Sequence, residues 1–174
     1  MQNIRTLFLF SAFAICNASH ISVAQSPEPA KPTAPTLEFV FEELVTLAPD
    51  VKVGPTPWGE RNIVPITGGT FSGPNIHGKV LPGGWDWQLT TADGCFQLHA
   101  DYFIQTDDGA IIHVVNTGSV CHQGDPILAT PIFEAPKGPH QWLNGGAYVS
   151  TVNGASIESK PTVRIRIYKI IPHP

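Results

Sequence analysis

Three polar residues, Asp86, Tyr102 and Asn116, stand where a β-strand would direct them to an otherwise apolar face. A carboxyl group on such a face must be hydrogen-bonded, paired or protonated. Burial raises a carboxyl pKa and suits Asp86 to general acid or base catalysis. Tyr102 can donate a proton or a hydrogen bond to a substrate oxygen, and Asn116 offers both a donor and an acceptor. The sequence therefore predicts a proton-transfer site, with Asp86 and Tyr102 catalytic and Asn116 binding the substrate.

Each of these residues also has a structural interpretation, which the sequence leaves open. Asp86 can accept hydrogen bonds from backbone N–H groups of the glycine-rich turn before it. Tyr102 can be an interior aromatic with a satisfied hydroxyl, and Asn116 can close the end of a strand near Gly118. Three further residues are expected to orient the substrate: Arg61, Trp142 and Asn144.

A second group of titratable residues, His99, Asp101 and His113, falls on the opposite face of the same strands. Asp101 and His113 would be diagonal neighbours, close enough for an ion pair. An acid/base dyad or part of a metal site is one interpretation, and an exposed polar cluster is the other. Because the spacing matches no zinc-binding pattern, we favour the polar cluster and expect neither a metal nor a cofactor.

Two turns set the register of the strands that carry these residues, Thr91–Gly94 (TADG) and Thr106–Gly109 (TDDG). Both fit a three-residue hairpin loop with glycine in the left-handed conformation. The second turn places Cys95 opposite Cys121, so we predict a disulfide; the alternative is two independent buried thiols. The first turn puts Asp86 on the face of Tyr102, whereas a two-residue loop there would move it to the other face.

The remaining pattern is β throughout. Apolar and polar residues alternate with period two in LEFVFEELV and TVRIRIYKII, and Gly, Pro and Asp turns separate the segments. We predict an all-β domain, a single antiparallel β-barrel of about nine strands of calycin or lipocalin type. The expected strands are 37–45, 61–66, 75–81, 85–91, 95–106, 110–121, 127–134, 145–152 and 162–171.

The glycine-rich stretch 68–87 is not a phosphate-binding loop. Its segment GPNIHGK approaches the Walker spacing, but Val80 replaces the required Ser or Thr. Pro82, Gly83 and Gly84 then prevent the helix that such a loop must open. The glycines instead suit bends and close backbone approach in a barrel.

The N-terminal residues predict export. Arg5, the apolar run 7–15 and the small-residue site before Ala24 are typical of a signal peptide over 1–24. That run is too short for a membrane span. A proline-rich linker, 25–36, would follow, and then the barrel domain, 37–174. The expected location is the periplasm or the exterior, where Cys95 and Cys121 would oxidise.

The motifs between Leu37 and Ile171 resemble the family known as domain of unknown function 3237. This resemblance implies a single-domain antiparallel β-barrel and no particular reaction. In the family pattern an acidic residue, a small residue and an arginine precede the tyrosine, where this chain has His99, Ala100 and Asp101 before Tyr102. The matching motifs are GER (59–61), PITGGT (65–70), GP (73–74), Gly78, VLPGGWDW (80–87), Tyr102, TDDGA (106–110), NTG (116–118), PIF (131–133), WLN (142–144) and VRIRIY (163–168).

The charge and composition of the chain limit the classes of molecule that it is expected to bind. The chain has 10 Lys and Arg against 14 Asp and Glu, and no basic cluster, which argues against nucleic acid. We expect an exported barrel that binds a small, partly apolar, oxygen-bearing molecule, as a cofactor-free isomerase, dehydratase or lactone hydrolase. The alternatives are a lipocalin-type carrier and a structural envelope protein. Whether strand edges pair into a homodimer stays open.

Overall fold

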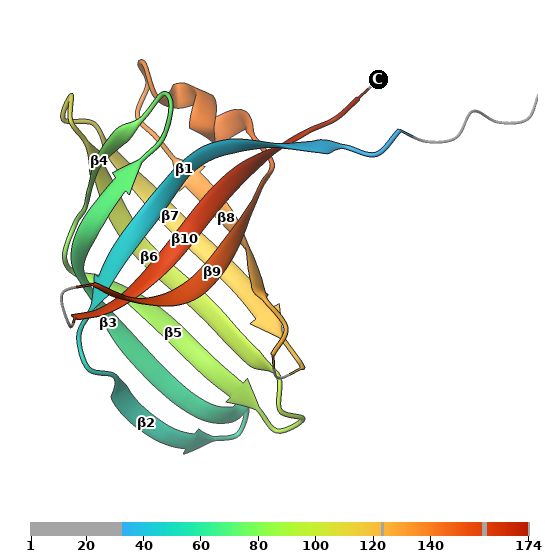
Figure 1. The fold of residues 1–174 in the computed structure, drawn as a ribbon. Helices are drawn as coiled ribbons and strands as arrows, with labels where there is room; N and C mark the ends of the chain where they lie inside the picture. Colours follow the sequence, from blue (N-terminus) through green and yellow to red (C-terminus); the bar gives the residue numbers. More distant parts are fainter. Residues whose placement is uncertain (1–32, 123, 158–159, 174) are drawn as a thin grey trace, which may run out of the picture. The chain divides into compact units, whose positions relative to one another are not determined.

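The alternating pattern folds into strands and one short 3₁₀ helix (Figure 1). The computed structural model describes residues 33–173 except 123 and 158–159. The predicted signal peptide and residues 25–32 of the predicted linker lie outside the described residues. The elements are β1 Thr36–Leu47, β2 Val51–Thr56, β3 Gly59–Ser72, β4 His77–Val80, β5 Gly84–Thr91, β6 Phe96–Thr106, β7 Ile111–Val120, β8 Ile127–Glu134, η1 Gln141–Gly145, β9 Tyr148–Ile157 and β10 Lys160–Ile171.

The strands close into an antiparallel β-barrel. Its order is β1–β3–β5–β6–β7–β8–β9–β10, and β10 pairs again with β1. The short β4 lies between β3 and β6, and β2 pairs with the first residues of β3. The predicted all-β barrel is therefore confirmed. Among the described residues, no helix is long and apolar enough to cross a membrane.

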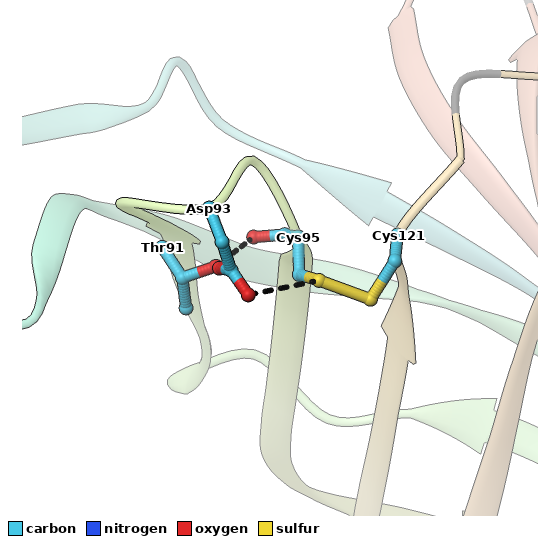
Figure 2. The surroundings of a disulfide bond; sticks show 4 residues. All are labelled: Thr91, Asp93, Cys95 and Cys121. Atoms are coloured by element: carbon cyan, nitrogen blue, oxygen red, sulfur yellow. Dashed lines mark hydrogen bonds between the residues drawn. A yellow bond between two sulfur atoms is a disulfide. The ribbon is translucent and has the colours of Figure 1, made fainter.

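The two hairpin loops have the predicted geometry and register. Gly94 and Gly109 both take positive φ, 87° and 92°. Cys95 and Cys121 lie opposite each other beyond the β6–β7 ladder and form a disulfide, with Cα atoms 4.0 Å apart (Figure 2). Thr91 donates a hydrogen bond to the Asp93 carboxylate inside the first turn, and its hydroxyl also lies 3.0 Å from the Cys95 carbonyl oxygen.

One half of the barrel interior is filled with side chains. Aromatic rings pack there with centroids 5.0–5.8 Å apart, from Phe41 to Phe71 and to Phe133, and from Phe133 to Tyr148. Leu143 of η1 adds a fully buried side chain to the same cluster. Figure 1 shows this helical turn over one end of the barrel. Any ligand-sized space must therefore lie toward the other end.

Strand β1 departs from the predicted alternation. The ladder between β1 and β10 shifts register between Phe39 and Phe41. Leu37 and Phe39, expected on the apolar face, are consequently 58% and 40% exposed. Beyond this bulge the alternation resumes with Phe41 and Val45 buried, and the residue between them on that face is Glu43.

Candidate functional site

The hollow half of the barrel holds a cavity of about 130 Å³. Its wall is mainly aliphatic, and the polar side chains among its lining residues come from β5, β6 and β7. The lining residues are Val45, Leu47, Ile66, Asp86, Gln88, Phe96, Leu98, Ala100, Tyr102, Asn116, Ile127, Val152, Gly154, Val163 and Ile165. Three of the residues predicted from sequence to act together, Asp86, Tyr102 and Asn116, thus line one cavity.

Register explains why Asp86 and Asn116 face the same space. Asp86 lies opposite Ala100 in the β5–β6 ladder, and Ala100 lies opposite Asn116 in the β6–β7 ladder. Residues directly opposite in neighbouring strands point to the same face of the sheet. The three residues therefore form one row across the barrel wall, with only the Ala100 methyl group between the two polar side chains.

Asp86 is a partly buried carboxyl group. Its Oδ2 accepts a hydrogen bond of 2.8 Å from Gln88 Nε2, while its Oδ1 is buried and has no partner among the described residues. Burial raises the pKa of Asp86 above its ordinary value, and the hydrogen bond from Gln88 and the nearby His99 oppose that rise only in part. This environment favours the protonated form of Asp86 more than solvent does, which suits a group that gives and takes a proton.

Tyr102 is tied to a second carboxyl group, Glu43 of β1. The Tyr102 hydroxyl donates a 2.6 Å hydrogen bond to Glu43 Oε2, and Glu43 is 0% exposed. Burial raises the pKa of Glu43 from 4.5 to about 7, and the bond from Tyr102 lowers it only partly. Burial, together with the neighbouring Glu43, also raises the pKa of Tyr102 well above its usual range. Glu43 itself is not among the cavity-lining residues.

Glu43 was not among the predicted site residues, although its sequence position carried a signal. With period two, it stands on the same face as Phe41 and Val45, both of which are buried. An acidic residue in that phase is a buried carboxyl candidate by the same argument that selected Asp86.

The Asn116 side chain is 1% exposed, and only one of its two polar atoms has a hydrogen-bond partner among the described residues. Its Oδ1 lies 3.1 Å from the Ser150 hydroxyl of β9, which donates to it. Its Nδ2 is buried and finds no acceptor in the part of the chain that the structure describes. A buried amide with a free donor costs free energy unless something else accepts that hydrogen bond.

Gly84 allows Tyr102 to sit where it does. A Cβ atom at position 84 would lie 2.4 Å from the Tyr102 Cβ atom, far inside normal contact. The start of β5 can therefore pass close to β6 only with glycine at this position. Gly84, two residues before Asp86, is thus needed for packing against the site.

The structure does not bring Arg61, Trp142 and Asn144 into the cavity. Arg61 points to the outer wall, because Val64 and Ile66 occupy the inward phase of β3, and its Nη1 lies 3.5 Å from the Gln88 carbonyl oxygen. Trp142 of η1 packs against the filled core. Asn144 bonds both backbone groups of Ala135, at 2.7 and 2.9 Å, which holds η1 on β8.

The outer face carries the expected polar cluster. His113 Nε2 lies 2.7 Å from Asp101 Oδ1, and the His113 ring stacks on Phe103 with centroids 4.9 Å apart. No group of three or more His, Cys, Asp or Glu side chains within the described ranges is placed to hold a metal ion.

Comparison with known proteins assigns the chain to a family. The family described as "Protein of unknown function (DUF3237)" matches residues 35–129. The chain belongs to this family. A UPF0311 protein of Rhodopseudomonas palustris (strain TIE-1) is 30% identical over 155 residues, which cover 79% of this chain and 99% of that protein.

Three further similarities bear on fold and chemistry. A β-barrel-like protein from Acinetobacter baumannii superposes with a TM-score of 0.70 at 28% identity, covering 81% of this chain and 99% of that one. The hydroalkoxylation enzyme phnH of Penicillium herquei is 33% identical over 115 residues, 66% of this chain and 72% of that protein. A crystal structure of an enzyme from Penicillium herquei gives a TM-score of 0.62 at 27% identity, covering 81% and 98%. This DUF3237 chain is therefore similar to at least one enzyme.

Proposed function

We propose that this protein is a small-molecule enzyme that transfers protons inside the barrel cavity. Asp86 is the proton-transfer group. Tyr102 polarises a substrate oxygen when Glu43 is protonated, because the Glu43 carboxyl group can then donate to the Tyr102 oxygen and leave the Tyr102 hydroxyl hydrogen for the substrate. The observation that carries the proposal is Asp86 itself, a carboxyl group on the wall of a mainly aliphatic cavity. Its pKa is raised, and one of its oxygens has no hydrogen-bond partner within the described part of the chain. Both groups that the chemistry needs come from the chain.

The reaction class we propose is addition of an O–H group across a C=C bond, or its reverse. The name of the similar enzyme from Penicillium herquei supports this class. Protonated Asp86 gives its proton to the alkene carbon, and the resulting carboxylate accepts the hydroxyl proton as the C–O bond forms. One O–H bond and one π bond break, one C–H and one C–O bond form, and Asp86 ends as it began. Elimination of an alcohol or of water is the same sequence in reverse.

Deuterium uptake tests the proposal across a range of candidate substrates. The full-length protein is incubated in D₂O with a panel of small hydroxy-alkenes and cyclic ethers, and products are followed by mass spectrometry. We expect at least one compound to convert with one solvent deuteron on carbon. Absence of both conversion and carbon-bound deuterium across the panel, with the protein folded, would contradict the proposal.

We also propose that the protein acts in an oxidising compartment after export. The Cys95–Cys121 disulfide supports this location, because such bonds persist outside the reducing cytosol. The intact mass of protein recovered from its producing organism without reductant is expected to lack residues 1–24 and two thiol hydrogens. A full-length mass with three alkylatable thiols, Cys16 included, would refute export.

A further inference from the structure

We propose that the cavity admits a neutral, hydroxyl-bearing molecule of about one ring, whose hydroxyl group bridges Asp86 and Asn116. This inference deepens the proposed function and rests on the cavity being its site. It specifies a substrate class, uncharged alcohols or phenols, and excludes carboxylates and phosphates of the same size.

Asp86 and Asn116 are spaced so that one group fits between the ends of their side chains. Asp86 and Asn116 lie on either side of Ala100 in adjacent ladders, two strand intervals apart. Strands in a sheet are about 4.8 Å apart, so the two Cα atoms are separated by roughly 10 Å. Two inward side chains at that separation leave room between their ends for one bridging group, since the residue between them is alanine.

A hydroxyl group matches the hydrogen-bonding needs of Asp86 and Asn116. Asp86 Oδ1 is an acceptor and Asn116 Nδ2 is a donor, and neither has a partner within the described residues. A hydroxyl group donates one hydrogen bond and accepts others, so it satisfies both atoms at once. An ether can only accept, so it would leave Asp86 Oδ1 unpaired whenever that oxygen carries no proton.

The charge of the cavity wall disfavours an anionic ligand. The residues that line the cavity include Asp86 and no Lys, Arg or His, and the buried Glu43 lies directly behind Tyr102. An anionic ligand would enter a low-dielectric space beside two carboxyl groups, with no Lys or Arg among the described lining residues to neutralise it. A neutral ligand avoids this cost.

The volume of the cavity limits the size of the ligand. The cavity holds about 130 Å³. An apolar protein cavity of about 150 Å³ accommodates benzene, so this space fits about one six-membered ring. Val45, Ile66 and Ile165 are among the apolar residues that would contact such a ring.

Fluorine NMR titration of the full-length protein tests the inference with three probes of similar size. The probes are 4-fluorophenol, 4-fluoroanisole and 4-fluorobenzoate at neutral pH. We expect 4-fluorophenol to bind at least tenfold more tightly than 4-fluoroanisole, and 4-fluorobenzoate to bind at least a hundredfold more weakly than the phenol. Equal affinity for the phenol and either analogue, or no binding of the phenol, would overturn the inference.

Variants locate the binding. Ala100→Leu fills the gap between the polar residues and should weaken 4-fluorophenol binding at least tenfold. Asn116→Ala removes the donor to the phenol oxygen and should weaken 4-fluorophenol binding at least threefold, whereas its exposed control on β9, Asn153→Ala, should leave this binding unchanged. Phenol binding that is unaffected by Ala100→Leu in a folded protein would place the site elsewhere and overturn the inference. Selective phenol binding without deuterium uptake would reject only the proposed reaction.

Discussion

Asp86→Asn is expected to lower the turnover number by about 10²–10⁴-fold on whichever substrate shows deuterium uptake, because general acid/base catalysis contributes rate factors of that size. The amide has the shape of the carboxyl group and can still accept the hydrogen bond from Gln88 Nε2, which spans 2.8 Å in the wild type. It cannot exchange a proton. We therefore expect KM to change by less than about threefold while kcat falls, which is the signature of a group that acts in the transition state.

The matched control for this prediction is Asp101→Asn. Asp101 is on β6, which pairs with the strand of Asp86, but its carboxylate lies on the outer wall and contacts His113 at 2.7 Å. Its replacement should leave kcat within twofold. If Asp86→Asn retains more than a tenth of wild-type turnover, Asp86 is not the proton-transfer group. A protein in which Asp86→Asn alters ligand affinity alone, with no turnover to lose, would be a carrier.

Glu43→Gln is expected to make the protein more stable than wild type at pH 8, by a difference that shrinks as the pH falls toward 5 and is lost below the ordinary pKa of 4.5. Glu43 is buried, and its pKa rises from 4.5 in the unfolded chain to about 7 in the folded protein. The folded state therefore binds more protons between these values, and the wild-type free energy of unfolding falls as pH rises through this window. A shift of this size corresponds to about 3 kcal/mol. Glutamine keeps an acceptor for the Tyr102 hydroxyl and never ionises.

Urea denaturation of wild type and Glu43→Gln at pH 5, 6, 7 and 8 measures this difference. Glu42→Gln is the control, because Glu42 is the neighbouring residue on the outer face and pairs there with Arg166 at 2.7 Å. The Glu42 variant should follow the wild-type pH dependence. A difference between Glu43→Gln and wild type that stays constant over this range would show that Glu43 is not a buried acid with a raised pKa.

Two hairpin turns set most of the register that could be predicted from the sequence. The turns TADG and TDDG are local, and each sets a register from its own loop geometry. From them the sequence correctly placed Cys95 opposite Cys121 and directed Asp86 inward with Tyr102. Simple alternation also assigned the inward face of β6 and β7 correctly, because period two sends successive side chains to opposite faces of a sheet.

The long-range part of the site could not be read in this way. Arg61 and Asn144 were assigned to the substrate from residue type alone, and the structure shows that the phase of β3 and the contact of η1 with Ala135 direct them elsewhere. The bulge in β1 exposed two apolar residues that simple alternation had placed inward. No turn connects β1 to the β5–β6–β7 sheet directly, so its register depends on the closed barrel.

The sequence by itself therefore determined the all-β pattern, although it missed β2 and the full length of β3, and it predicted the two hairpin registers and a common face for Asp86, Tyr102 and Asn116. These features depend on short-range alternation and on single hairpin turns. Only the tertiary structure decided that Glu43, 59 positions before Tyr102, lies against its hydroxyl. That contact requires β1 to pair with both β3 and β10 and so to close the barrel. The cavity, too, exists only in the closed barrel. Side chains from all eight barrel strands line it, so its position and volume cannot be inferred from any one hairpin.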